Sequence, residues 1–188
     1  MSIFLVRHGE TPCSGTYCGS TNPPLTPHGR SQGDAAASLL AKFPIDICYS
    51  SPLLRAKQTA QILRRRLGMP VLTRVSLKEI DFGAWEGLRF ADIKAKWPDM
   101  AHQWLKDPMA VRIPEAEPFE ALRRRVKRFL DDIKPERTKG HVLVVAHGGS
   151  LAAIALELLC LPDREFPQFI QPTGSIRIVQ GREVLPLC

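Results

Sequence analysis

Two short apolar runs at opposite ends of the chain constrain its fold most, because each is uninterrupted and each ends in a histidine followed by glycine. Residues 3–6 lead into Arg7 and His8, and residues 142–146 lead into His147. Such runs without polar alternation are typical of strands that are buried on both faces, as in a parallel sheet covered by helices. Helical patterns lie between the two runs. This alternation of strands and helices predicts an α/β sandwich.

Turn and capping signals predict the other elements. Strands are expected at residues 46–50 and 70–73 and, as a terminal hairpin-like pair, at 175–179 and 183–187. A first helix is expected at about 29–42, with Thr26 as its N-cap and Pro27 in its first turn. A second is expected to begin at a Ser51-Pro52 cap and to end near Gly68. Two more are expected at 119–133, with Pro118 as the first helical residue, and at 150–159.

The segment from Leu88 to Pro118 is expected to be helical in pieces, since a proline follows both Trp97 and Asp107. Two interpretations of its tryptophans stay open. Trp97 and Trp104 either pack in the core or cover a site as a lid.

Composition and charge limit the partners of this protein. The chain has 188 residues, of which 44% are hydrophobic, so residues 1–188 fit one domain with a core that needs no disulfides. Its formal net charge of +7 favours nucleic acid, an acidic membrane or a small phosphorylated molecule. Two arginine triplets, 64–66 and 123–125, are predicted to form solvated helix faces, and no aromatic residues alternate with them. We therefore expect a small phosphorylated metabolite and not nucleic acid.

The cysteines and the amino terminus predict a cytoplasmic protein. Five scattered cysteines without zinc-ligand spacing are typical of a reduced compartment. Cys13 and Cys18 lie close together in the loop after His8, where they are either thiols without a role or a regulatory disulfide. The apolar run before Arg7 is too short for a signal peptide or a membrane span. Neither export nor a membrane partner is expected.

Five polar residues are predicted at strand ends or in the loops and helix starts that follow: Arg7, His8, Arg55, Glu79 and His147. In an open α/β sheet, such positions converge on one crevice. Guanidinium groups bind a tetrahedral oxyanion with forked donors. The helix starts after Ser51 and Gly148 would add free N–H groups. The sequence therefore predicts a phosphoryl-binding site.

A phosphoryl group beside imidazoles suggests nucleophilic catalysis. A neutral His8 would attack phosphorus to form phosphohistidine, which water then hydrolyses. The leaving oxygen needs a proton, and Glu79 is the preferred donor if its surroundings favour the protonated carboxyl. Glu10 follows His8 too closely to reach across the phosphate, and Glu86 is expected to cap or pair locally.

A metal site is the alternative, because His8, His147 and nearby acids could bind a divalent ion. The adjacent arginines would repel a metal but complement phosphate. We therefore expect activity without a metal or any other cofactor.

Five motifs in this order carry a family resemblance: LVRHGET at 5–11, PLTPHGRSQ at 24–32, SSPLLRAKQTA at 50–60, EIDFGAWEG at 79–87 and AHGG at 146–149. Together the motifs resemble the histidine phosphatase superfamily, in its phosphoglycerate-mutase-like branch, over essentially the whole chain. The resemblance implies a three-layer α/β/α sandwich around a mostly parallel sheet with one antiparallel strand, which the terminal pair would supply.

The resemblance also implies roles for individual residues. His8 would be the phosphorylated nucleophile and Glu79 the proton donor. The phosphoryl group would be bound by a set of residues around His8: Arg7, Arg55, His147, Ser14, Gly19 and Gly148.

Several positions depart from the family pattern. Ser14 stands where many members have an asparagine, and Ala116-Glu117-Pro118 replaces a common Gly-Glu-Ser step. Mutases of this branch typically carry asparagine and arginine where this chain has Gly149 and Ala152. They also carry an insertion that shields the phosphohistidine from water. The compact chain therefore favours hydrolysis.

Within the branch, the chain is most similar to small phosphatases of the α-ribazole type, which act in cobalamin biosynthesis. Phosphoserine or broad-specificity phosphatase activity, mutase activity and a non-enzymatic phosphoryl-binding module stay as alternatives. A homodimer is compatible with the sequence.

Overall fold

The computed structural model describes residues 2–137, 139–181 and 183–187. Within these residues, six strands form one sheet in the order β3-β2-β4-β1-β5-β6. Their bounds are β1 (Ile3–Arg7), β2 (Ile45–Ser50), β3 (Val71–Thr73), β4 (His141–Ala146), β5 (Ile176–Gln180) and β6 (Glu183–Leu187). Neighbouring strands are parallel except at β5, which is antiparallel to both β1 and β6. The expected sheet with one antiparallel strand is confirmed.

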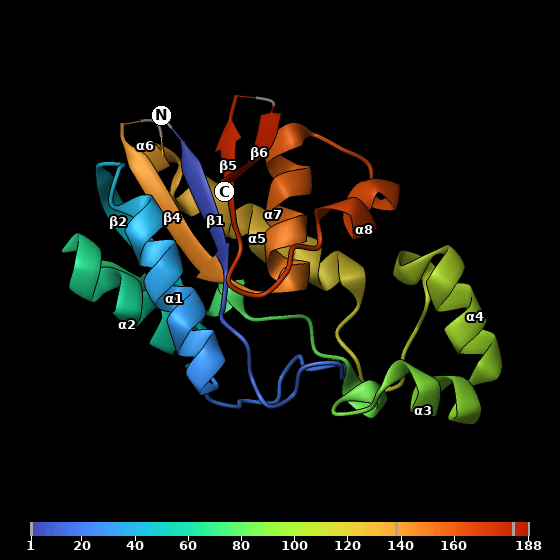
Figure 1. Ribbon diagram of the computed structural model, residues 1–188. Helices are drawn as coiled ribbons and strands as arrows, with labels where there is room; N and C mark the ends of the chain where they lie inside the picture. Colours follow the sequence, from blue (N-terminus) through green and yellow to red (C-terminus); the bar gives the residue numbers. More distant parts are fainter. Residues whose placement is uncertain (1, 138, 182, 188) are drawn as a thin grey trace.

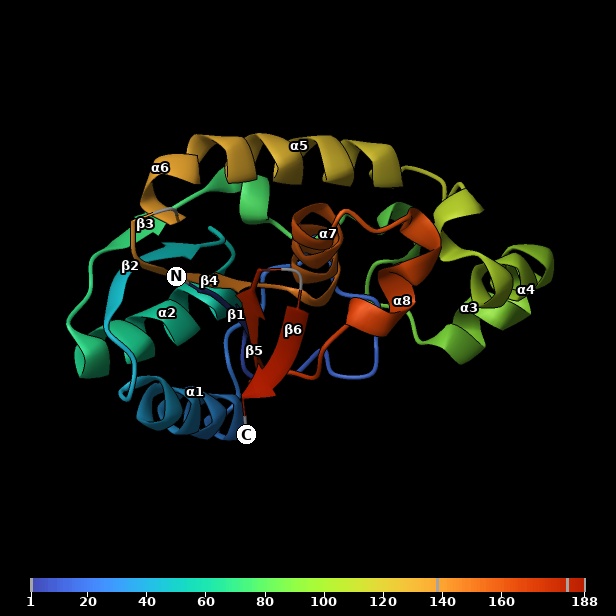
Figure 2. The ribbon, with the colours of Figure 1, turned by 90° about the horizontal axis from the view of Figure 1, so that it is seen from above.

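Helices cover both faces of this sheet, and the three-layer arrangement is confirmed. Figure 2 shows α1 and α2 on one side and α5, α6 and α7 on the other, while α3 and α4 extend beyond the sandwich. The bounds are α1 (Pro27–Leu40), α2 (Leu54–Leu67), α3 (Phe90–Lys96), α4 (Pro98–Lys106), α5 (Phe119–Asp132), α6 (Lys134–Arg137), α7 (Gly148–Leu159) and α8 (Phe166–Phe169).

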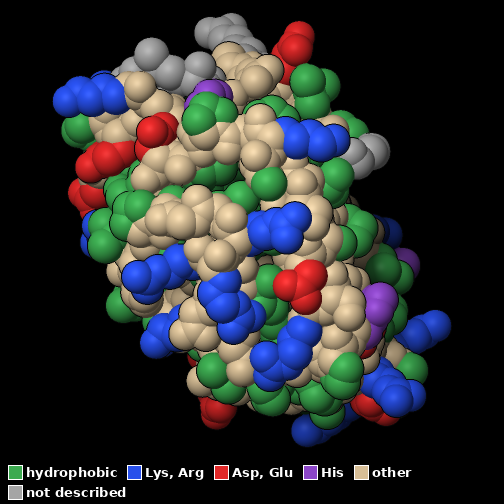
Figure 3. Space-filling model, turned by 60° about the vertical axis from the view of Figure 1, so that its left-hand side comes forward, with side chains coloured by type: hydrophobic (Ala, Val, Ile, Leu, Met, Phe, Trp, Pro, Cys, Tyr) green, Lys and Arg blue, Asp and Glu red, His purple; other side chains and the backbone are tan. Residues whose placement is uncertain are grey.

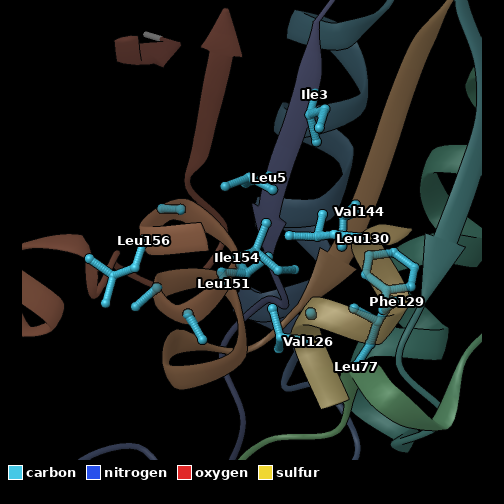
Figure 4. Packing of buried hydrophobic residues seen from close by; sticks show 14 of the residues in the cluster. Ile3, Leu5, Leu77, Val126, Phe129, Leu130, Val144, Leu151, Ile154 and Leu156 are labelled. Carbon is cyan, nitrogen blue, oxygen red and sulfur yellow. The ribbon is translucent and has the colours of Figure 1, made fainter. Parts of the chain in front are cut away.

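Strand β1 is apolar from Ile3 to Val6, where both of its faces are covered. Ile3 and Leu5 belong to the core cluster that includes residues of α5 and α7, and Figure 4 shows Leu5 near Val144 and Ile154. Phe4 and Val6 belong to the second cluster, which includes residues of α1 and α2. An uninterrupted apolar run is therefore the pattern that this central strand requires.

The starts of the helices agree only partly with the local sequence signals. Thr26 caps α1, since its Oγ1 accepts a hydrogen bond from N–H of Gly29 at 2.9 Å, and Pro27 occupies the first turn. The expected Ser51-Pro52 cap of α2 is wrong, because N–H of Leu54 donates to Oδ1 of Asn22 at 2.6 Å. Asn22, which lies 32 positions earlier in the sequence, therefore accepts the hydrogen bond from the first N–H group of this helix.

Two other starts are shifted slightly from the expected positions. Pro118 is the N-cap of α5 and not its first residue, and α7 begins at Gly148, two residues before the predicted Ser150.

The segment before α5 is helical in pieces, as predicted, and it forms a third cluster around Trp85 and Ile93. Trp97 and Trp104 both pack on this cluster, and Trp104 also lines a cavity described below. Packing is therefore confirmed for both tryptophans, and a lid role of Trp104 stays a prediction.

The basic triplets differ in their surroundings. Residues 64–66 are exposed, as predicted, and Lys and Arg side chains on the face in Figure 3 are spread among other types. The second triplet departs from the prediction, because Arg123 pairs with Glu157 and Arg125 pairs with Glu117, all half-buried. These two arginines therefore form ion pairs within the fold and do not belong to a solvated helix face.

The helices were compared with the requirements of a membrane-spanning segment. In the part of the chain that the structure describes, none of them combines the length and the apolar character that a membrane crossing requires.

Candidate active site

The carboxyl ends of β1 and β4 place two histidines side by side. These strands are parallel neighbours in which Arg7 lies opposite Ala146, so the next residues, His8 and His147, leave the sheet at the same edge (Figure 1). Their ring centroids are 5.0 Å apart. Arg55 reaches the same place from the first turn of α2, which follows β2.

The Nε–H group of Arg55 is shared between the two imidazoles. It lies 3.3 Å from Nε2 of His8 and 3.2 Å from Nδ1 of His147. Both of these ring nitrogens must accept, so the hydrogens lie on the opposite nitrogens. Accordingly, Nδ1 of His8 donates to the Gly9 carbonyl at 2.7 Å, and Nε2 of His147 donates to Oγ of Ser51 at 2.8 Å. His8 thus directs an unprotonated Nε2 toward the site.

Burial keeps both histidines neutral. Burial and the charge of Arg55 lower the pKa of His8 to about 3. Burial, His8 and Arg55 hold the pKa of the fully buried His147 well below its usual range. A neutral imidazole has the free electron pair that nucleophilic attack requires.

Backbone carbonyls hold the guanidinium of Arg55. Nη1 donates to the carbonyl of Thr21 at 2.6 Å, and Nη2 donates to the carbonyls of Gly19 at 2.9 Å and Cys18 at 3.2 Å. Burial lowers the pKa of Arg55, but arginine starts so far above neutrality that it keeps its charge. The loop after His8 therefore fixes a buried cation against the nucleophile candidate.

Arg7 carries an unused donor. Its Nη1 donates to the carbonyl of Gln171 at 2.6 Å, whereas its buried Nε has no hydrogen-bond partner among the described residues. A Cβ atom on Gly148 would lie 3.3 Å from Cζ of Arg7, so glycine leaves room for the guanidinium at the start of α7. A buried unpaired N–H is costly, and an oxyanion beside it would supply the acceptor.

The carboxylate of Glu79 occupies the start of α7. Its Oε2 accepts from N–H of Gly149 at 3.0 Å, and its Oε1 accepts from N–H of Ser150 at 3.1 Å. A carboxylate is favoured there because the helix dipole is positive at its N-terminus. The prediction of free N–H groups at this helix start is therefore wrong, because Glu79 uses them.

Two N–H groups at the start of α2 that were expected to be free are also bonded. N–H of Leu53 donates to Oγ of Ser51 at 3.3 Å, and N–H of Leu54 donates to Asn22.

A cavity of about 470 Å³ extends from this cluster. Arg7, His8, Arg55 and Glu79 line its charged end, with Ser14 and Gly148. Its other walls are mainly apolar and aromatic, and they include Phe82, Phe90, Trp104, Met109, Val111, Ile113, Phe119, Phe166 and Ile170. One cavity thus combines charged side chains around His8 with walls that are mainly apolar.

Two predicted phosphoryl ligands do not line the cavity. His147 lies behind Arg55, and the N–H group of Gly19 donates to Glu86 at 2.9 Å. Direct contact of either residue with a phosphoryl group stays a prediction.

Neither competing acid takes the place of Glu79. Glu10 accepts from Thr26 Oγ1 at 2.9 Å, and Glu86 accepts hydrogen bonds from nearby loops, as expected. Glu117 lines the cavity, but both of its carboxylate oxygens pair with Arg125.

Arg125 supports the segment that carries Glu79, a role that the sequence did not predict. It donates to the carbonyls of Ser76, Lys78 and Glu79 at 2.6 to 3.1 Å. Ser51 and Gln171 were also missed as parts of the site. The position of Ser51 directly after β2 was the available signal for it, whereas nothing local marks Gln171.

The thiols near the site are free. Cys13 and Cys18 line the cavity without forming a disulfide, and burial raises the pKa of Cys18 to about 11. A thiol with such a pKa is a poor nucleophile at neutral pH. Cys188 lies outside the described residues.

No group of three or more His, Cys, Asp or Glu side chains suited to a metal occurs among residues 2–137, 139–181 and 183–187.

Comparison with known proteins identifies the family. Residues 3–184 match the family described as histidine phosphatase superfamily, branch 1. The chain belongs to this superfamily. The expected family is therefore confirmed, and histidine phosphatase relatives support an enzyme over a non-enzymatic module.

Relatives with different substrates match nearly the full chain. The adenosylcobalamin/alpha-ribazole phosphatase of Salmonella typhimurium is 32% identical over 186 residues, covering 96% of this chain and 92% of that protein. Phosphoserine phosphatase 1 of Hydrogenobacter thermophilus is 28% identical over 185 residues, covering 97% and 88%.

A solved structure agrees with this histidine phosphatase fold. The mycobacterial glucosyl-3-phosphoglycerate phosphatase in complex with VO3 superimposes with a TM-score of 0.87 at 26% identity, covering 98% of this chain and 95% of that one. All three proteins are named as phosphatases, and their names give different substrates.

Proposed function

We propose that this histidine phosphatase hydrolyses a phosphomonoester through a phosphohistidine formed on Nε2 of His8, without a metal. The observation that carries the proposal is the buried, neutral imidazole whose Nδ1–H is held by the Gly9 carbonyl, so that its Nε2 electron pair faces a cationic pocket. This is the protonation state that attack on phosphorus requires.

The residues around His8 take the remaining roles. Nε2 of His8 forms a bond to phosphorus while the bond from phosphorus to the leaving oxygen breaks. Arg7 and Arg55 stabilise the charge on the equatorial oxygens. Glu79, whose protonated form the bound phosphoryl dianion favours, gives a proton to the leaving oxygen. The Glu79 carboxylate then takes a proton from water, which attacks the phosphohistidine and releases phosphate and neutral His8.

The preferred substrate in this proposal is α-ribazole 5′-phosphate, which assigns the protein to cobalamin biosynthesis in the cytoplasm. The apolar and aromatic cavity walls favour a bulky, planar leaving group, because such a group would bury surface against Trp104 and Phe82. Phosphoserine is the second candidate, supported by the relative from Hydrogenobacter thermophilus. Its small charged serine would leave most of these walls unused.

Phosphate release tests this assignment. The purified protein is assayed with α-ribazole 5′-phosphate, phosphoserine, 3-phosphoglycerate and a sugar phosphate, each with and without EDTA. The expected result is the highest kcat/KM for α-ribazole 5′-phosphate and no effect of EDTA. A higher kcat/KM for phosphoserine would overturn the substrate, loss of activity with EDTA would overturn the metal-free mechanism, and net formation of 2-phosphoglycerate would support a mutase.

A further inference from the structure

The carboxylate of Glu86 joins two loops beside the active site without lining the cavity. Its Oε1 accepts from the N–H groups of Gly19 and Ser20, both at 2.9 Å, and of Phe82 at 3.1 Å. Its Oε2 accepts from N–H and Oγ1–H of Thr21 at 3.3 and 2.6 Å. One side chain therefore collects five hydrogen bonds, four of them from residues 19–21.

The same stretch of backbone holds Arg55 from its other side. The carbonyls of Cys18, Gly19 and Thr21 accept from Nη1 and Nη2 of Arg55, while N–H groups of residues 19–21 point to Glu86. The peptide groups thus lie between an anion on their N–H side and a cation on their C=O side. This orientation is electrostatically favourable at both ends.

Close packing leaves this arrangement little freedom. A Cβ atom on Gly19 would lie 2.0 Å from the Ile80 carbonyl oxygen and 2.5 Å from Oε1 of Glu86. Partial burial alone would raise the pKa of Glu86, but the hydrogen bonds from Thr21, Phe82 and Ser20 outweigh it and lower the pKa. The carboxylate therefore stays charged at the pH where the site is assayed.

We propose that Glu86 is a positioning residue for the reaction: by fixing residues 18–21, it holds the Arg55 guanidinium between the two histidines and against the phosphoryl group. The inference rests on the proposed function, since it assigns Arg55 to the transition state. Glu86 itself contacts neither the substrate nor the reacting atoms.

Two substitutions at Glu86 measure this role. Glu86→Ala removes all five hydrogen bonds, and the expected result is a fall in kcat on the order of a hundredfold, as for a small misplacement of a catalytic group. Glu86→Gln can keep the three bonds to Oε1 and should fall less. The matched control is Glu157→Gln, which removes another half-buried carboxylate that pairs with Arg123 away from the cavity and should leave kcat unchanged. A Glu86→Ala enzyme with wild-type kcat overturns the inference.

A double-mutant cycle separates positioning from general loss of structure. If Glu86 acts through Arg55, adding Glu86→Ala to an Arg55→Gln enzyme should lower kcat by less than twofold. An additional fall as large as that in the wild-type background would overturn the inference. The acid limb of kcat/KM gives a second readout, because a displaced Arg55 no longer lowers the pKa of His8 and the limb should move to higher pH. An unmoved limb in an enzyme of reduced kcat would also overturn it.

Further variants serve as controls for folding and for the proposed function. Should Glu86→Ala not fold, Thr21→Val removes the hydroxyl that donates to Oε2 but keeps the carbonyl that accepts from Arg55. A severalfold lower kcat in this variant supports the inference, and an unchanged kcat overturns it. Full activity of His8→Ala would contradict the proposed function, whereas an inactive His8→Ala with a fully active Glu86→Ala contradicts only the inference.

Discussion

Nε of Arg55 donates to Nε2 of His8 across 3.3 Å, so the buried cation and the nucleophile candidate are in direct contact. An N–H group can be donated only to a free electron pair, and the contact therefore selects the neutral imidazole. The same positive charge is available to the phosphoryl oxygens. In this site, the group that favours the reactive form of the histidine also stabilises the charge of the transition state.

Replacing Arg55 with lysine should lower kcat on the order of a hundredfold or more, although the charge is kept. A lysine ammonium cannot donate to three loop carbonyls while it also faces both histidines. Steady-state kinetics with one phosphomonoester measure the effect. Arg64→Lys in the exposed part of the same helix is the matched control, and equal kcat values for the two variants would contradict the role of Arg55.

Stability should depend on pH through His8. Its pKa is about 3 in the folded protein and about 6.5 when unperturbed, so between these values the unfolded chain binds a proton that the native protein excludes. This contribution to stability is fully present above pH 6.5 and is lost as the pH falls toward 3. Urea unfolding of wild type and His8→Gln between pH 7 and 4 should show a steeper decline in wild type. Parallel declines would argue against the shifted pKa.

Activity should follow the same pKa. The pKa of His8 is lowered to about 3, so its imidazole stays neutral at pH values where a histidine is usually protonated. The acid limb of kcat/KM that belongs to the nucleophile should therefore lie below pH 5. A nucleophile limb near pH 6.5, assigned by NMR titration of His8, would exclude the depressed pKa.

Glu79→Gln should affect esters according to their leaving groups. An alkyl phosphate needs a proton on its leaving oxygen, and its kcat is expected to fall by ~10²-fold or more, whereas p-nitrophenyl phosphate needs little protonation and should lose much less. Gly149→Ala should act in the same direction, because the new Cβ would lie 2.6 Å from Oε1 of Glu79. Equal losses for the two esters would assign proton donation to another group.

The aromatic wall should determine substrate preference. Trp104→Ala is expected to raise KM for α-ribazole 5′-phosphate about tenfold and to leave KM for phosphoserine nearly unchanged, as expected for a lost aromatic contact. Trp97→Ala is the control, since Trp97 packs on the same cluster but does not line the cavity. Equal effects of Trp104→Ala on both substrates would remove the support for a bulky leaving group.

The sequence predicted the parts of the site that depend on chain-local patterns. The apolar runs before His8 and His147 indicated strands, and strands of that kind bring their ends to one edge of a parallel sheet. Arg55 and Glu79 were found because they follow further strands. These residues do converge in the structure.

Contacts between distant segments could not be predicted in the same way. Asn22 takes over the cap of α2, Glu79 takes the N–H groups of α7, and Glu86 and Arg125 hold loops that carry other site residues. Each of these contacts joins positions that only the folded chain brings together. Local propensity carries no information on which of several competing polar side chains will reach them.

Rapid-quench labelling tests the central claim most directly. The enzyme is mixed with a substrate that carries labelled phosphorus and is stopped within one turnover in alkaline denaturant, because the P–N bond of phosphohistidine is labile in acid. The expected result is one labelled peptide, with the label on His8, and no label in His8→Ala. Label on another residue, or turnover by His8→Ala at the wild-type rate, would contradict it.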